Sequence, residues 1–167
     1  LSLVNQLEQT LMKFPGIGRF MKVTLSLLLA RDYFRLGRES DAAAMLDKVV
    51  PVTEGQRAEI ADIRRLFQKT TGLVADIAQR RKDHQSVAAS AIDLSSCYLE
   101  LGDARSALSV LEQELQRRKE HSEYDLLRMR EAIAGAYMHL KDYQKAEEVS
   151  RTLVKPYADH IGNLEWP

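Results

Sequence analysis

The chain has 167 residues, of which 45% are apolar and 29% charged, and its 24 Lys and Arg balance its 24 Asp and Glu. This length predicts one domain with a sizeable core, and the zero charge balance removes the electrostatic case for a nucleic-acid binder. Cys97 is the only cysteine. An intramolecular disulfide is therefore excluded, which favours a reducing, intracellular compartment such as the cytoplasm. The longest apolar run, at 25–30, is too short to cross a bilayer, so we expect no membrane insertion.

Helical periodicity dominates the sequence, and no segment shows sustained strand alternation. The predicted helices lie at about 2–13, 19–36, 39–50, 54–69, 85–101, 104–120, 123–140 and 142–155. Proline and two glycines at 14–18 separate the first two helices, and Pro51 closes the third. Thr53 and Gln56 have the spacing of a capping box for the fourth helix. Residues 70–72 break or loosen that helix before it resumes to about 82.

Three segments repeat one pattern: 27–46, 92–111 and 131–150. In each segment a large apolar residue precedes a small one, and a tyrosine follows. A turn begins four residues after the tyrosine, and an alanine lies five residues after the start of the turn. The tyrosines are Tyr33, Tyr98 and Tyr137, and the alanines are Ala42, Ala107 and Ala146. We expect the small residues to let two antiparallel helices approach closely, and the tyrosines to fill the gap between neighbouring helix pairs.

The turns of the three copies differ in one residue. Gly37 and Gly102 are expected to adopt the left-handed conformation that ends a helix. Lys141 replaces glycine in the third copy, and this replacement is expected to cost a little stability at that turn.

This pattern resembles the tetratricopeptide (TPR) repeat family. The resemblance covers roughly 20–155, and three copies in phase are a stronger signal than any single copy. It implies an all-α fold, a TPR-like right-handed superhelix of stacked antiparallel helix pairs. Gly102 and Lys141 are 39 residues apart, longer than the usual period of the family, so these repeats resemble extended TPR repeats.

The resemblance implies a single TPR-like helical repeat domain over 1–167. Its parts are an N-terminal capping helix and turn at 1–18, repeats at 19–50, 85–120 and 123–155, and a C-terminal tail at 156–167. The segment 54–83 is either a degenerate repeat or a single long helix. Phe67 follows Tyr33 by the usual family period, but Arg64 and Asp76 then occupy positions that require small residues.

In TPR proteins the first helix of each pair lines a concave groove that takes a peptide or helix of a partner protein. The resemblance therefore implies four groove-facing residues in each copy. They are Thr24, Leu27, Arg31, Arg35, Ala89, Ile92, Ser96, Glu100, Arg128, Glu131, Gly135 and His139. This mixture suits a partner segment with both apolar and charged character. The alternative is that these residues are exposed and bind no ligand.

No constellation of residues indicates catalysis, a cofactor or a metal site. The four histidines form no pair at metal-binding spacing, and Cys97 has no second thiol nearby. The basic clusters at 80–82 and 117–119 are interpreted as solvated helix ends, and the GIG motif at 16–18 as a turn. Glu112, Glu114, Glu147 and Glu148 are expected on the solvated, convex side, and none stands out as an acid or a base. We therefore expect a protein that is not an enzyme.

The sequence predicts a protein–protein interaction scaffold or adaptor that binds a protein or peptide partner. Asp93 stands where chaperone-binding TPR domains need an asparagine for an acidic tail, and it would repel a carboxylate, so binding of chaperone tails is not expected. Two alternatives remain open. One is an assembly subunit of a multiprotein complex that uses its end faces, with Trp166 near one end. The other is a ligand-sensing regulatory domain of a larger protein.

Overall fold

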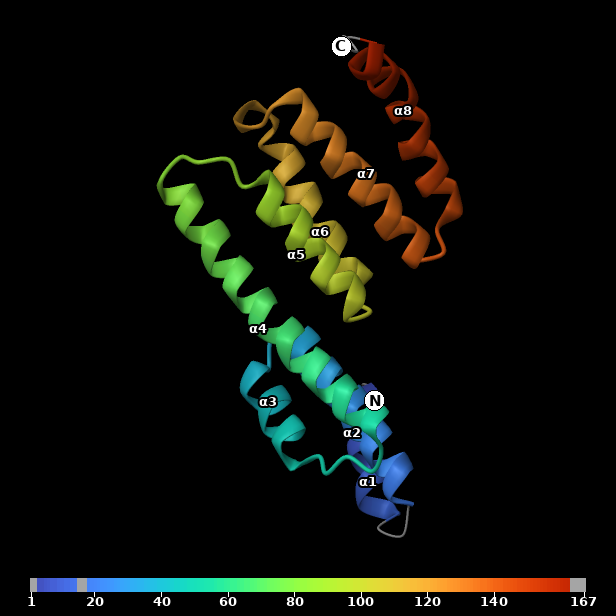
Figure 1. The fold of residues 1–167 in the computed structure, drawn as a ribbon. Coiled ribbons are helices and arrows are strands. Elements are labelled where there is room, and N and C mark those ends of the chain that lie inside the picture. Colours follow the sequence, from blue (N-terminus) through green and yellow to red (C-terminus); the bar gives the residue numbers. More distant parts are fainter. Residues whose placement is uncertain (1–2, 15–17, 163–167) are drawn as a thin grey trace. The chain divides into compact units, whose positions relative to one another are not determined.

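The computed structural model describes residues 3–14 and 18–162, and within these ranges the chain forms eight α-helices and no strand (Figure 1). The helices are α1 (Leu3–Lys13), α2 (Arg19–Arg35), α3 (Glu39–Lys48), α4 (Glu54–Lys82), α5 (Ala88–Glu100), α6 (Ala104–Gln116), α7 (Glu123–His139) and α8 (Tyr143–Gly162). A short 3-10 helix, Arg118–Glu120, follows α6. The all-α class predicted from the sequence is confirmed. Gly16, Ile17 and Trp166 lie outside the described residues.

Most helix boundaries lie within three residues of those predicted, and the largest difference is at α8. This helix continues to Gly162, whereas the sequence pattern predicted an end near 155.

The chain divides into two compact units, Leu1–Gln68 and Lys69–Pro167. The long helix α4 contributes residues 54–68 to the first unit and residues 69–82 to the second. The helix is continuous through Thr70, Thr71 and Gly72, where the sequence had predicted either a break or a loosened helix.

In the first unit, α2 packs against α1, α3 and the first half of α4. The rings of Phe34 on α2 and Phe67 on α4 stack with centroids 4.1 Å apart. Leu29, Leu46 and Ile63, from α2, α3 and α4, are among the most deeply buried side chains of this unit. Apolar burial therefore holds three helices of this unit together.

The start of α4 is fixed by the predicted capping residues. Thr53 Oγ1 accepts a hydrogen bond from the Gln56 N–H at 3.1 Å. The Gln56 side chain accepts in return from the N–H of Val52 at 2.8 Å, one residue before the position that a standard capping box uses. Buried Gln56 also donates from Nε2 to the Phe20 carbonyl of α2 at 3.4 Å. These bonds join the α3–α4 connection to α2.

In the second unit, α5 contacts both α6 and α7, α6 contacts α7, and α7 contacts α8, as Figure 1 shows. One core cluster includes Ala107, Leu111, Leu126 and Met129, from α6 and α7. Another core cluster contains Ile77 of α4, Val87 directly before α5, and Ala91 and Leu94 within α5. Each helix of this unit therefore packs against a neighbour in the sequence, and α5 and α7 also meet directly.

The three repeated turns share one pattern of backbone hydrogen bonds. The N–H groups of Arg38, Asp103 and Asp142 donate to the carbonyls of Tyr33, Tyr98 and Tyr137 at 2.9, 2.7 and 3.0 Å. The residue before each donor has a positive φ: 71° at Gly37, 78° at Gly102 and 60° at Lys141. This pattern is the Schellman motif, which satisfies the last carbonyls of a helix.

A fourth turn of the same kind ends α4, and the sequence pattern did not predict it. His84 has a φ of 55°, and the Gln85 N–H donates to the Arg80 carbonyl at 2.9 Å. Histidine tolerates the left-handed region better than most side chains. A turn prediction that relies on glycine does not identify a turn that has histidine in this position.

The small residues of the repeat lie in the helix contacts, as predicted. Ala42, Ala107 and Ala146 are buried, and so are Ala30, Ser95 and Ala134 on the preceding helices. A larger side chain at any of these positions would force the paired helices apart.

Two of the repeat tyrosines make equivalent bonds to the preceding helix. Tyr33 donates its hydroxyl to Glu8 on α1, and Tyr137 donates to Glu112 on α6 at 3.3 Å. The hydrogen bond to Glu8, followed by burial, raises the pKa of Tyr33 above its ordinary value. Burial, followed by the negative charge of Glu112, raises the pKa of Tyr137. Tyr33 and Tyr137 therefore each connect a helix pair to the helix before it by an apolar ring and a polar tip.

We predict that Lys141→Gly stabilises the chain by about 0.5–1 kcal/mol, because a side chain in the left-handed region strains the backbone. The measurement is the midpoint of urea denaturation. The matched control is Gly102→Ala. An added Cβ there meets no heavy atom within 4 Å, so only backbone strain acts, and a loss of about 1 kcal/mol is expected. If neither midpoint moves, the turns do not limit stability.

Candidate partner-binding surface

Four predicted groove residues form one stripe along α5. Ala89, Ser96 and Glu100 are exposed, and Ile92 is half-buried. Their spacing of three or four residues places them on one face of the helix. The Ser96 hydroxyl donates to the Ile92 carbonyl at 3.1 Å within the helix, so it adds little polarity to the surface.

The corresponding stripe on α7 carries more charge. Arg128, Glu131 and His139 are exposed, and Gly135 is half-buried. Arg128 Nε lies 3.6 Å from Glu131 Oε2, and its guanidinium carbon lies 6.0 Å from the centre of the Tyr124 ring. Gly135 leaves a position without a side chain in the middle of this stripe, and an added Cβ would meet nothing within 4 Å there.

The two stripes lie on helices that contact each other directly, since α5 meets α7. Together they offer two acids, Glu100 and Glu131, two basic groups, Arg128 and His139, and apolar surface at Ile92. The second unit therefore brings eight of the predicted residues onto two neighbouring helices.

The remaining predicted residues belong to α2 in the first unit, and they are less available. Leu27 is only 2% exposed and lies in the core. Half-buried Arg31 pairs with Glu59 of α4 at 3.3 Å, and exposed Arg35 pairs with Asp32 at 3.2 Å. Thr24 donates its hydroxyl to the Phe20 carbonyl at 3.1 Å within α2. These side chains are largely engaged within the unit, so α2 offers a poorer surface than α5 and α7.

One expectation about the carboxylates was wrong. Glu114 of α6 was placed on a solvated side, yet it is fully buried. Arg81 from the end of α4 donates to Glu114 Oε1, and His121 Nε2 lies 3.6 Å from Glu114 Oε2. The His121 side chain is also fully enclosed.

This buried polar cluster, Arg81, Glu114 and His121, connects three segments of the second unit. Glu114 Oε2 and both ring nitrogens of His121 have no hydrogen-bond partner among the described residues. A sequence signal for it exists: Ala107, Leu111 and Glu114 are spaced by four and three residues, the spacing of one buried face. The basic cluster at 80–82 is therefore only partly a solvated helix end.

The other candidate sites take ordinary places in the fold. Cys97 is a buried free thiol on α5. Among the residues that the structure describes, no group of three His, Cys, Asp or Glu side chains is placed to hold a metal ion. No helix in the described ranges combines the length and the apolar character needed to span a bilayer.

Comparison with protein-family models, with curated proteins and with solved structures gave no match for this chain.

We predict that Arg81→Leu destabilises the second unit by about 2 kcal/mol, because the buried carboxylate of Glu114 then loses its guanidinium partner. This loss of stability is smaller than the loss expected on breaking a fully buried ion pair, because the Arg81 side chain is 35% exposed. Glu114→Leu should cost less, since Arg81 reaches water. The double variant should then be more stable than the sum of the two losses predicts. Additive losses in urea denaturation would show that the two side chains are not coupled.

Proposed function

We propose that this chain is a TPR-like scaffold or adaptor that binds a peptide or helix of a partner protein along α5 and α7. The observation that supports it most is the direct contact between α5 and α7, the first helices of two successive pairs. In a right-handed stack of helix pairs the first helices line one side, and the second helices, here α6 and α8, line the other.

The recurrence of one turn supports the assignment of these elements as repeats. The turns after α5 and α7 have the same hydrogen bonds, and each has a left-handed residue, Gly102 or Lys141, at the same position. Because each turn sets the direction of the following helix, equal turns produce equal pairs. Equal pairs stack side by side and leave the first-helix stripes in line.

The composition of the stripes indicates the kind of partner. Arg128 and Glu131 stand on α7, Glu100 stands on α5, and Ile92 provides apolar area. A partner segment with charges of both signs and an apolar anchor complements this surface. Both stripes lie on helices held by a packed core, so little ordering cost falls on this chain when it binds.

The proposed role is binding without catalysis, and it needs no cofactor or metal. The balanced charge of the chain argues for a protein partner rather than a nucleic acid. The buried free thiol of Cys97 suits a reducing compartment, and we place the proposed adaptor in the cytoplasm.

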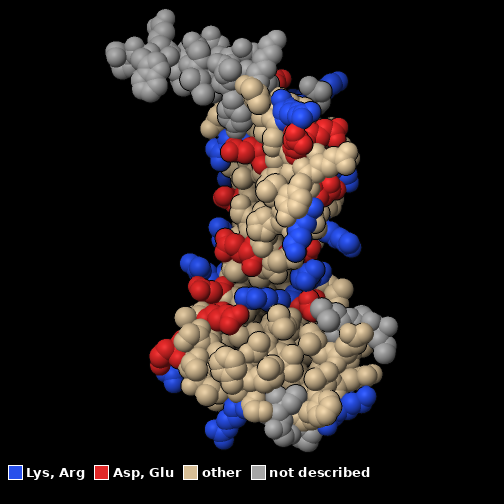
Figure 2. All heavy atoms as spheres, turned by 90° about the vertical axis from the view of Figure 1, so that its right-hand side faces the viewer, with Lys and Arg blue, Asp and Glu red and all other residues tan. Residues whose placement is uncertain are grey.

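A second candidate is assembly through an end face of the first unit. Four large apolar side chains near the end of α1 and the start of α2 are exposed. They are Met12, Phe14, Phe20 and Met21. Figure 2 shows the lower part of the molecule, which belongs to this unit, as a broad face with few charged side chains. Exposed apolar area of this kind is typical of surfaces that bind other proteins.

We predict that exchanging the charges of the stripes, Glu100→Arg with Arg128→Glu, abolishes partner capture without loss of helix content. Both side chains are exposed, so the fold should tolerate the exchange. The measurement is affinity purification from a cell extract with quantitative mass spectrometry, supported by circular dichroism.

The matched control is Arg105→Glu with Glu148→Arg, an equal exchange between exposed residues of α6 and α8. It should capture the same proteins as the wild type. Capture that survives the first exchange but is lost in Phe20→Ser with Met21→Ser would contradict the groove and favour assembly through the end face.

A further inference from the structure

A cavity of about 570 Å³ opens in the first unit between α2 and the connection from α3 to α4. It lies within the size range of ligand pockets in proteins. None of the predicted groove residues lines it. The sequence carries no motif for it, because its walls come from two helices and a loop.

Three basic side chains line this cavity, and no carboxylate does. They are Arg19 and Lys22 of α2 and Lys48 at the end of α3. None of the three has an ion pair with another described residue. By contrast, the other arginines of this unit, Arg31, Arg35, Arg38, Arg57, Arg64 and Arg65, each pair with a carboxylate. No ion pair among the described residues therefore neutralises the positive charge of the cavity.

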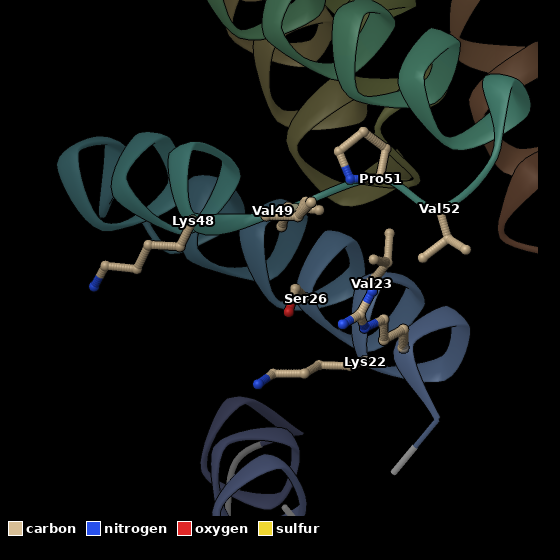
Figure 3. Close-up of a pocket in the computed structure, with 9 residues that line it drawn as sticks. Lys22, Val23, Ser26, Lys48, Val49, Pro51 and Val52 are labelled. Carbon is tan, nitrogen blue, oxygen red and sulfur yellow. The ribbon is translucent and has the colours of Figure 1, made fainter. Parts of the chain in front are cut away.

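Figure 3 shows how these side chains lie. Lys22 and Lys48 extend to the same side of the cavity from two different helices, and Ser26 lies between them. Their positive charges act together on any group that enters there, because opposite charges attract more strongly near a low-dielectric wall.

The other wall of the cavity is apolar. Val23 is buried, and Val49 and Pro51 are half-buried. Val50 and Val52 are 79% and 52% exposed, so apolar surface continues out of the cavity along the loop. Surface of this extent suits an extended chain better than a single small molecule.

The loop that forms this wall is held in place before any ligand arrives. Gln56 accepts from the N–H of Val52 and donates to the carbonyl of Phe20 on α2. Pro51 fixes one further backbone dihedral. The apolar wall and the basic side are therefore held at a defined distance, which lowers the ordering cost of binding.

We propose that this cavity is a second docking site, which binds an acidic peptide segment of a partner through its carboxylates and an adjacent aliphatic or aromatic side chain. The carboxylates meet Lys22, Lys48 and Arg19, and the apolar side chain packs on Val49, Pro51 and Val52. This site uses no residue of the α5–α7 surface, so it stands or fails separately from the function proposed above.

The test is a selection from a phage-displayed library of random peptides against the full chain. Acidic residues next to a large apolar residue should be enriched in the selected peptides. A fluorescein-labelled copy of the most enriched peptide is then titrated by fluorescence anisotropy. Lys22→Glu with Lys48→Glu should weaken binding on the order of tenfold or more, since two attractive contacts become repulsive. Higher salt should weaken the wild-type complex as well.

The matched control is Lys69→Glu with Lys82→Glu, an equal charge change at exposed positions of α4 that line no described pocket. It should bind the peptide like the wild type. The proposal is overturned if acidic peptides are not enriched, or if both double variants bind equally. It is also overturned if only Glu100→Arg with Arg128→Glu abolishes binding, or if inorganic phosphate binds as tightly as the peptide.

Discussion

The structure depends on one backbone hydrogen bond that recurs in every repeated turn, from the residue after the left-handed position to the carbonyl of the repeat tyrosine. In the turns of Tyr33 and Tyr137, the tyrosine that accepts this bond also donates its hydroxyl to the helix before it. The residue that donates this bond also accepts one, through its backbone carbonyl, from the N–H of the repeat alanine. The accepting and donating residues are Arg38 and Ala42, Asp103 and Ala107, and Asp142 and Ala146. One short segment therefore fixes the end of a helix, the direction of the next one and the packing of both.

The long helix α4 shows what happens where this turn is missing. Thr71 falls one family period after Gly37, and a β-branched residue is strongly disfavoured in the left-handed region. Asp76 falls at the alanine position, where a carboxylate cannot enter a tight helix contact. It stays partly exposed instead and accepts from Ser90 at 2.6 Å and from Arg80 at 2.7 Å. These two hydrogen bonds, that from Ser90 first, lower the pKa of Asp76. The turn position and the alanine position of the repeat both hold unsuitable residues here, and the helix continues.

The features that sequence reasoning predicted are those set by local chemistry. Gly37 and Gly102 indicate the positions of their turns, and the spacing of Ala42 and Ala107 predicts that both are buried. Features set by contacts between distant segments were missed. Glu114 is buried because Arg81 reaches it from 33 residues earlier, and a helical pattern alone assigns no such partner. Leu27 was assigned to the groove by its repeat position, but the packing of α2 within the first unit buries it.

The two proposed surfaces differ in whether their charged side chains already form ion pairs within the chain. This difference determines how each surface would bind a partner. Arg128 on α7 lies beside Glu131, so a partner of the α5–α7 surface must share or replace an existing interaction. The net gain from such an exchange is small, and shape and apolar contact then determine affinity. Lys22 and Lys48 form no ion pair with another described residue, and no carboxylate lines the cavity, so an acidic ligand gains attraction there without breaking an ion pair. Binding at the cavity should therefore depend strongly on salt, and binding at the α5–α7 surface much less.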